Sequence, residues 1–273
     1  MGLPAPAGAA ALVTGASSGI GVAIARELAG RGYPLVLVAR REELLQSLAT
    51  ELRAERDVEA KVIAADLSDP SERERLATEV QGSGAAVSIL VNNAGFGSQG
   101  DFAHNDPNRM LEMVRVNVEA VVDLTSRFLP GMLRRGSGAI INLASTAAFQ
   151  PMPGSAVYAA SKSFVLSFSE ATRTELRGSG VTVTAVCPGP VRTEFTDAAG
   201  MGDVETTTPD LLWMSAEEIA RHAVEGAERD KRVVVPGALN RAQSIVGHHS
   251  PRAVALPLIQ RIWRSTAGGA TGD

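Results

Sequence analysis

The chain has 273 residues, of which 45% are hydrophobic, and its formal net charge is −4. This length fits one large domain over residues 1–273, and the slightly acidic balance argues against a nucleic-acid-binding surface. The single cysteine, Cys187, excludes an internal disulfide and a cysteine metal cluster, and its apolar surroundings indicate a core side chain rather than a nucleophile. With no apolar run long enough to cross a membrane and no basic stretch typical of a signal peptide, we expect a soluble, cytoplasmic protein.

Short apolar runs rich in β-branched residues alternate with longer helical patterns. Seven of these runs are predicted strands: residues 9–14, 34–39, 60–65, 88–92, 139–143, 181–186 and 232–235. Strands that alternate with helices form βαβ units with right-handed crossovers. The sequence therefore predicts an α/β fold in which a parallel sheet has helices on both faces.

A glycine-rich turn, TGASSGIG, follows the first predicted strand at residues 14–21. Its glycines permit a tight turn and a close approach of the backbone to a phosphate. The helix that follows supplies free N–H groups and the positive end of its dipole. The spacing is GxxxGxG rather than the commoner GxGxxG, so the turn alone is a weak signal. Its place between a strand and a helix indicates a dinucleotide site.

Arg40 and Arg41 follow the second predicted strand. An NAD-binding fold usually has an acidic residue here, which holds the ribose 2′-hydroxyl. A guanidinium instead pairs with a 2′-phosphate, so Arg40 predicts NADP(H) as the cofactor. A solvated arginine pair at a helix start is the alternative, and for Arg41 both a phosphate contact and a solvent-facing position stay open.

Tyr158 and Lys162 stand four residues apart in a chain that has only two tyrosines and three lysines. On a helix such a pair lies on one face. The ammonium is then expected to lower the phenol pKa from about 10, which would let Tyr158 exchange a proton near neutral pH. Two unrelated surface residues are the alternative for this pair taken alone.

The segment 194–214 is long and rich in Gly and Thr. A long insert without regular structure in a compact domain is more often a functional lid than a segment without a role. The Ser215-Ala-Glu-Glu218 motif after it predicts a capping box that opens a helix. Residues 238–273 form a C-terminal extension with weak patterning and a flexible end. The four histidines lack metal-ligand spacing, so we expect no metal.

These motifs together resemble the short-chain dehydrogenase/reductase family over about residues 8–237. The resemblance rests on the glycine loop, Asn92-Asn-Ala-Gly95, Ser145, Tyr158-Ala-Ala-Ser-Lys162 and Pro188-Gly189, which occur in the family's order and rough spacing. It implies a single doubly wound Rossmann-type domain with a seven-stranded parallel sheet.

The resemblance also implies a catalytic set of Asn117, Ser145, Tyr158 and Lys162. Tyr158 would be the general acid in reduction and the base in oxidation, and Lys162 would lower its pKa and hold the nicotinamide ribose. Ser145 would hold the substrate carbonyl and stabilise its developing charge. Asn117 would hold a water that links Lys162 to solvent.

For the cofactor, the resemblance assigns Asp66-Leu67 to the adenine ring, Asn93–Gly95 to the adenine ribose and the nicotinamide side, and Val191 and Thr193 to the nicotinamide carboxamide. With the glycine loop and the arginine, the expected cofactor set is Gly15, Ser17, Ser18, Gly19, Ile20, Arg40, Asp66, Leu67, Asn93, Ala94, Gly95, Tyr158, Lys162, Pro188, Gly189, Val191 and Thr193. The candidate substrate residues are Ser145, Tyr158, Phe96, Gln150 and Phe195, and Met152, Leu211 and Trp213 are further candidates for the pocket. They indicate a mostly apolar pocket, compatible with steroid-like, acyl or aromatic ketones.

We therefore expect an NADP(H)-dependent oxidoreductase that moves hydride between nicotinamide and a carbonyl or secondary alcohol, chiefly as ketone or aldehyde reduction. One alternative is a non-catalytic NADP(H)-binding sensor or regulator, since one fold serves many functions. Another is an NAD-linked alcohol dehydrogenase, which Arg40 disfavours. The substrate itself stays open.

A homodimer or homotetramer is expected, because the helical regions near 107–134 and around Tyr158 have apolar positions on more than one face. In the family that the chain resembles, these two helices commonly pair across a two-fold axis. The C-terminal run PRAVALPLIQRIWR has two open uses, an addition to an interface or contact with a membrane through Trp263 and its arginines. Its two prolines weaken a single amphipathic helix, so we expect no membrane partner.

Overall fold

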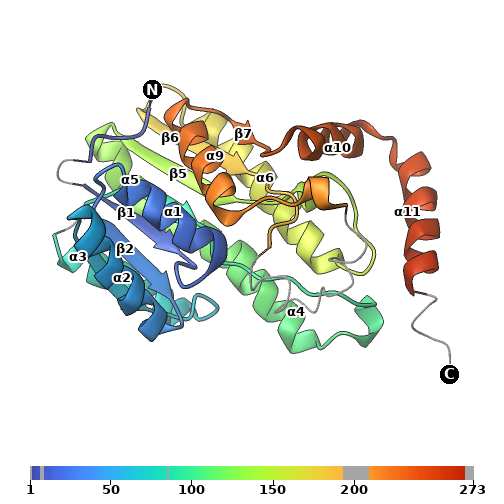
Figure 1. Ribbon diagram of the computed structural model, residues 1–273, viewed down its shortest axis with the longest axis horizontal. Helices are drawn as coiled ribbons and strands as arrows, with labels where there is room; N and C mark the ends of the chain where they lie inside the picture. Colours follow the sequence, from blue (N-terminus) through green and yellow to red (C-terminus); the bar gives the residue numbers. More distant parts are fainter. Residues whose placement is uncertain (1, 7–8, 85, 193–208, 268–273) are drawn as a thin grey trace.

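A seven-stranded parallel sheet forms the centre of the computed structural model, which describes residues 2–6, 9–84, 86–192 and 209–267 (Figure 1). The strand order is β3-β2-β1-β4-β5-β6-β7, as expected for a doubly wound Rossmann-type sheet. The strands are β1 (Ala9–Thr14), β2 (Leu35–Ala39), β3 (Ala60–Ala64), β4 (Ala86–Asn92), β5 (Gly138–Leu143), β6 (Val181–Val186) and β7 (Val233–Val234). The predicted strands and the predicted fold class are confirmed.

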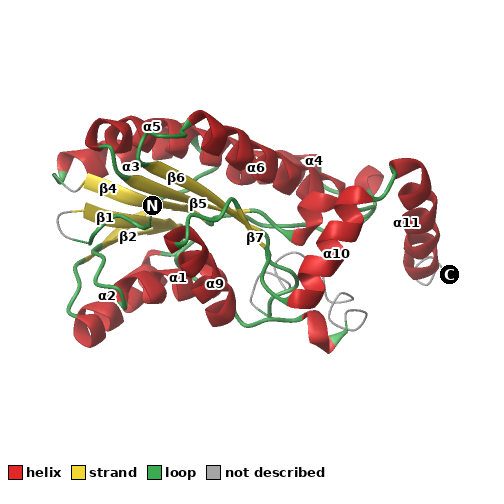
Figure 2. Ribbon diagram, turned by 90° about the horizontal axis from the view of Figure 1, so that it is seen from above, coloured by secondary structure: helices red, strands yellow, loops and turns green. Residues whose placement is uncertain are grey.

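Helices cover both faces of this sheet, and Figure 2 shows the layers from above. Helices α1, α2 and α9 lie on one face, and α3, α5 and α6 lie on the other. The helices are α1 (Gly19–Ala29), α2 (Glu42–Arg56), α3 (Pro70–Gly82), α4 (Pro107–Val114), α5 (Ala120–Arg135), α6 (Ala156–Glu175), α9 (Ala216–Glu228), α10 (Ala238–His249) and α11 (Arg252–Ala267). Short helical turns are η1 (Phe102–His104), η2 (Arg115–Glu119), η3 (Thr146–Phe149) and η4 (Asp210–Leu212).

Two apolar layers explain why the central strands are continuous hydrophobic runs. Every residue of β2, β5 and β6 is buried, because each strand contacts helices on both sides. The chain leaves β1 toward β2 on one side and later returns to β4 on the other, so the direction of winding reverses between β1 and β4. The crevice beyond the carboxyl ends of the strands at such a reversal is where ligands bind in open α/β sheets.

The long helix expected near 107–134 is interrupted. Between α4 and α5, the residues of η2 form a π-helical turn rather than an α-helical one. A π turn holds one more residue than an α turn and is frequent at functional sites. It turns Asn117 into the protein, where its side chain is fully buried.

The C-terminal part of the chain is more ordered than its weak sequence patterning predicts, since α10 and α11 are both helices. The predicted capping box is confirmed at the start of α9, where the Glu218 amide donates to Ser215 Oγ over 3.1 Å. Most of the predicted lid segment 194–214, namely residues 194–208, lies outside the described residues. Its described end forms η4 and a parallel bridge between Val191 and Met214. No helix within the described ranges combines the length and apolar character that a membrane crossing requires.

Candidate active site

The glycine loop forms a tight turn between β1 and α1. Gly15 and Gly19 have φ angles of +67° and +53°, which glycine adopts without steric cost. A Cβ atom on Gly21 would lie 2.1 Å from the Gly15 carbonyl oxygen, so no side chain fits there. Ser18 is the N-cap of α1, yet its side chain makes no capping hydrogen bond. Among the described residues, no side chain caps the first amide groups of α1, which suits them to an anionic ligand.

Thr14 joins the end of β1 to the end of β4. Its hydroxyl donates to the Val91 carbonyl over 3.1 Å and accepts from the amides of Asn93 and Ala94 over 3.0 Å each. The Asn93 side chain donates to the Thr14 carbonyl over 2.9 Å. Sequence reasoning included Thr14 only as part of a motif. The structure shows that it holds the predicted cofactor residues Asn93 and Ala94 against the glycine loop.

Arg40 and Arg41 both follow β2 but have different contacts. The Arg41 guanidinium donates to Ser17 Oγ over 3.3 Å, which places a positive charge at the predicted phosphate site. Arg40 reaches across to α4, where its Nη1 lies 3.2 Å from Glu112 Oε1. Arg109 Nη1 lies 3.2 Å from the other oxygen of the same carboxylate. Sequence reasoning missed Glu112, because 72 residues separate it from Arg40.

Ser145 and Tyr158 meet beyond the carboxyl end of β5, and their side chains are hydrogen-bonded to each other. Ser145 is the N-cap of η3, with its Oγ accepting from the Ala147 amide over 3.1 Å. Lys162 lies one turn along α6 from Tyr158, and its Nζ is 5.8 Å from the centre of the phenol ring. Its ammonium donates to the Leu143 carbonyl at the end of β5 over 2.8 Å. The three predicted residues therefore converge at one edge of the sheet.

The Asn117 side chain connects two segments of the site. Its Oδ1 accepts from the Phe96 amide over 3.1 Å, and its Nδ2 donates to the Phe96 carbonyl and to Ser161 Oγ over 3.0 Å each. A Cβ atom on Gly95 would lie 2.9 Å from Asn117 Oδ1 and 3.3 Å from Lys162 Nζ. Glycine at position 95 thus lets the loop after β4 lie directly against both predicted catalytic side chains.

The proton equilibria differ from the expectation that Lys162 lowers the pKa of Tyr158. Burial raises the pKa of Tyr158 above its ordinary value, and the hydrogen bond from Ser145 offsets part of that rise. Burial also lowers the pKa of Lys162, to about 8, because a charged ammonium is costly to remove from water. The pKa of Tyr158 is therefore raised rather than lowered as expected, because burial outweighs the neighbours that favour the phenolate.

Cys187 lies beside this group and is fully buried. Burial raises the pKa of its thiol to about 12, so the nucleophilic thiolate is not formed at neutral pH. This confirms the interpretation of Cys187 as a core side chain.

The remaining predicted residues lie at the same edge of the sheet wherever the structure describes them. Asp66 and Leu67 follow β3, and Pro188, Gly189 and Val191 follow β6. Phe96 lies under the guanidinium of Arg109, 3.8 Å from its ring centre, and Gln150 faces Gly247 of α10. Thr193 and Phe195 lie outside the described residues. Among the described residues, no three His, Cys, Asp or Glu side chains form a group that could hold a metal ion.

Comparison with known proteins shows which family has this fold and these motifs. A family model described as short chain dehydrogenase matches residues 9–202. Sulfoacetaldehyde reductase 2 of Chromohalobacter salexigens is 39% identical over 214 residues, covering 77% of this chain and 84% of that protein. The ketoacyl reductase HetN of Nostoc sp. is 32% identical over 255 residues, covering 90% and 87%. A short-chain dehydrogenase from Sphingobium yanoikuyae, solved in complex with NADPH, superposes with a TM-score of 0.79 at 34% identity, over 88% of this chain and 92% of that one.

The lowered Lys162 pKa predicts how stability depends on pH. Between its folded pKa of about 8 and its ordinary value of 10.5, Lys162 is neutral in the folded chain but still protonated in the unfolded one, so the burial penalty disappears as pH rises. Relative to Lys162→Met, the wild-type free energy of unfolding should therefore rise by up to about 3 kcal/mol across this range. Urea denaturation of both proteins at a series of pH values measures the difference. Lys231→Met, at an exposed lysine, is the matched control, and a constant difference for Lys162→Met would contradict the burial argument.

Proposed function

We propose, from the premise that this chain belongs to the short-chain dehydrogenase family, that it reduces a ketone or aldehyde with NADPH. The observation that supports this most directly is the hydrogen-bonded Ser145–Tyr158 pair, with Lys162 one helical turn away, beside a glycine loop. Arg41 on Ser17 gives that loop the positive charge that a 2′-phosphate requires, and Arg40, the preceding residue, supplies a second guanidinium.

The glycine loop and the start of α1 fit a pyrophosphate, Lys162 would hold the nicotinamide ribose, and Asn93 would border the adenine ribose. When bound, NADPH supplies the hydride. Tyr158 then donates its phenolic proton to the carbonyl oxygen of the substrate, and Ser145 holds both that oxygen and the phenol. A raised pKa suits this direction, because it keeps Tyr158 in the protonated form that a general acid needs.

Lys162 and Asn117 support the proton transfer rather than perform it. With a pKa of about 8, Lys162 can gain or lose a proton near neutral pH, which makes it a suitable link between Tyr158 and solvent. Asn117 lies next to it across Gly95 and orients the loop that borders the reacting groups.

For the substrate we propose a carbonyl attached to an apolar chain. Phe96 and Trp213 border the site through the loops after β4 and after η4, and both rings have an arginine guanidinium nearby. The relative HetN is named a ketoacyl reductase, which agrees with a ketone on an acyl chain.

Substitutions at Tyr158 and Ser145 test the reaction. Tyr158→Phe removes the proton donor but leaves the glycine loop intact, so turnover should fall by about 10²–10⁴-fold while NADPH still binds. Ser145→Ala should lower turnover by about 10²–10³-fold, again with cofactor binding unchanged. NADPH oxidation with a panel of acyl, aromatic and steroid-like ketones measures turnover, and NADPH fluorescence measures binding.

The same assay separates an enzyme from a non-catalytic sensor. A sensor would bind NADPH with no ketone-dependent oxidation in the wild type. Wild-type turnover in Tyr158→Phe on a verified substrate would mean that another group donates the proton and that the proposed site is wrong.

Cofactor choice is tested at Arg40 and at its partner Glu112. Arg40→Asp should abolish a preference for NADPH over NADH that we expect to be at least about 10-fold. Glu112 holds Arg40 in an exposed ion pair, so it competes with a 2′-phosphate for the same guanidinium. Exposed pairs contribute about 0.2–1 kcal/mol, and Glu112→Gln should therefore tighten NADPH binding by about 1.4–5-fold and NADH binding by a smaller factor.

Titration of both cofactors gives these dissociation constants. Glu72→Gln is the matched control, because Glu72 also pairs with an exposed arginine, Arg75, at 2.6 Å. Equal changes for NADPH and NADH in Glu112→Gln would contradict a role in 2′-phosphate selection, and an unchanged preference in Arg40→Asp would exclude Arg40 from it.

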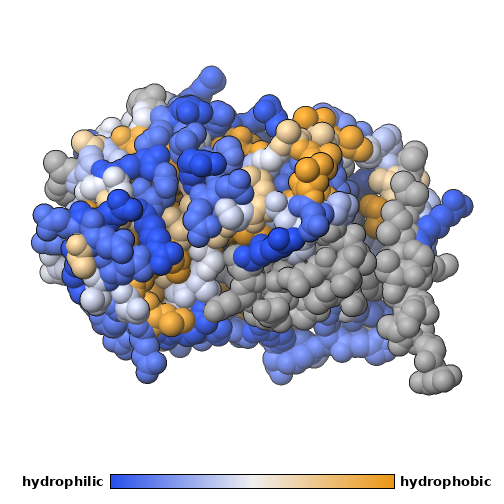
Figure 3. Space-filling view, viewed as in Figure 1, coloured by the Kyte–Doolittle hydropathy of each residue, from blue (hydrophilic) through white to orange (hydrophobic). Residues whose placement is uncertain are grey.

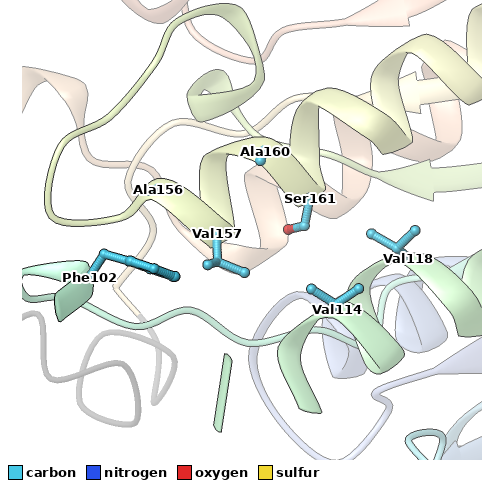
Figure 4. A pocket seen from close by; sticks show the side chains of 7 residues that line it. All are labelled: Phe102, Val114, Val118, Ala156, Val157, Ala160 and Ser161. Atoms are coloured by element: carbon cyan, nitrogen blue, oxygen red, sulfur yellow. The ribbon is translucent and has the colours of Figure 1, made fainter. Parts of the chain in front are cut away.

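Assembly is the second part of the proposal, and an open apolar groove supports it. Figure 4 shows the groove between η2 and α6. It has a volume of about 510 Å³ and is lined by Phe102, Val114, Val118, Ala156, Val157, Ala160 and Ser161. Phe164 and Val122, on α6 and α5, are also 40% and 37% exposed. Exposed apolar surfaces of this kind are typical of interfaces.

We expect a closed oligomer in which these helices of two subunits pair. Val122→Arg with Phe164→Arg should convert it to monomers, because the two-fold contact would bring like charges together. Light scattering should give at least twice the chain mass of 28.4 kDa for the wild type and one chain mass for the variant. A wild-type mass of one chain at micromolar concentration would refute the assembly.

A further inference from the structure

Helix α10 exposes apolar side chains and buries polar ones. Leu239, Ile245 and Val246 are 45%, 53% and 66% exposed, whereas Asn240 and Ser244 on the opposite side are buried. A surface helix of a globular protein normally has the reverse arrangement. The outer side of α10 is therefore suited to contact with something other than water.

The apolar surface continues onto the neighbouring turn η4, where Leu211 is 81% exposed. Asn240 Nδ2 donates to the Leu212 carbonyl over 3.1 Å, which fixes η4 beside α10. Figure 3 shows apolar residues gathered over this part of the molecule. We call Leu211, Leu239, Ile245 and Val246 the α10 patch.

The charge on the α10 and α11 side of this patch is one-sided, whereas beside Leu211 the exposed Asp210 carboxylate is paired with Arg192. Residues 231–272 contain six Lys or Arg and no Asp or Glu, although the whole chain has a net charge of −4. Arg241, Arg252 and Arg261 are exposed on α10 and α11, and none of them forms an ion pair within the described part of the chain. Figures 1 and 2 show α11 extending beyond α10, away from the sheet.

We infer that the α10 patch and the basic residues of α10 and α11 form a peripheral docking surface for an anionic lipid bilayer. The apolar side chains enter the boundary between headgroups and acyl chains, and the arginines pair with lipid phosphates. From the sequence, the two prolines of residues 251–264 argue against a single amphipathic helix and hence against a membrane partner. The structure removes this objection, because Pro251 precedes α11 and Pro257 lies inside α11 without ending it.

A second copy of the chain fits this surface less well than a bilayer does. A two-fold contact through the α10 patch would place the same arginines of both subunits against each other, with no acidic residue in 231–272 to neutralise them. An anionic lipid surface supplies that neutralisation together with an apolar layer.

The position of α10 connects this surface to the reacting groups. Its inner side packs on η3, where the rings of His248 and Phe149 lie 6.0 Å apart, and η3 directly follows Ser145. Docking through α10 would therefore bring the site close to the lipid, where a carbonyl on an acyl chain would be held.

Vesicle sedimentation with the full chain tests the inference. The wild type should bind phosphatidylcholine–phosphatidylglycerol vesicles at least about tenfold more strongly than pure phosphatidylcholine vesicles, because its arginines require anionic lipid. Ile245→Glu with Val246→Glu should lose at least about tenfold of that binding, and Arg241→Glu with Arg252→Glu should lose the dependence on phosphatidylglycerol. Leu44→Glu, at a 42% exposed apolar residue on α2, is the matched control and should bind as the wild type does.

Circular dichroism and NADPH binding establish that each variant is folded. Absence of wild-type binding to both vesicle types overturns the inference, as does equal binding by Ile245→Glu with Val246→Glu. The inference is also overturned if the wild type binds no vesicles but has a concentration-dependent mass that is lower in this double variant. That result would assign the α10 patch to contact between copies of the chain.

Discussion

The hydrogen bonds of the buried Asn117 side chain hold the site together. One amide group satisfies both backbone groups of Phe96, in the loop after β4, and also donates to Ser161 on the helix that holds Tyr158 and Lys162. A buried polar group without partners is costly, so each of these contacts is strongly favoured once Asn117 is inside. The π turn brings it inside, and the loop with Gly95 is thereby positioned against Lys162.

Local sequence predicted those parts of the structure that depend on local chemistry. The strands were predictable because β2, β5 and β6 are buried on both faces and read as unbroken apolar runs. Parallel strands end at one edge of a sheet, so residues that follow strands, such as Ser145 after β5 and Arg40 after β2, lie along that edge. The capping box at Ser215 was predictable for a similar reason, since its partner is three residues away.

Other features depend on contacts between distant segments and were not predictable from one sequence. The Arg40–Glu112 pair joins residues 72 positions apart, and the pKa of Tyr158 reflects burial that no motif encodes. A π turn has no distinct sequence pattern. Helix α10 was missed because it buries its polar side, so the spacing of its apolar residues does not identify the side that packs on the core. Buried Lys162 shows the same conflict between local and global preferences, which is expected where function requires a group that stability disfavours.

Asn240 gives the C-terminal extension a structural part in the site. Its side chain lies so close to Gly189 that a Cβ atom there would be 2.5 Å from it, and it also bonds the turn that ends the loop after β6. Helix α10 is thus a wall of the crevice rather than an appendage, although it follows the last strand of the sheet. A chain shortened to the sheet and its flanking helices would lack this wall, and the segment after Pro188 would lose its inner support. The sheet is therefore complete at Val234, before the chain supplies the side chain that supports this segment.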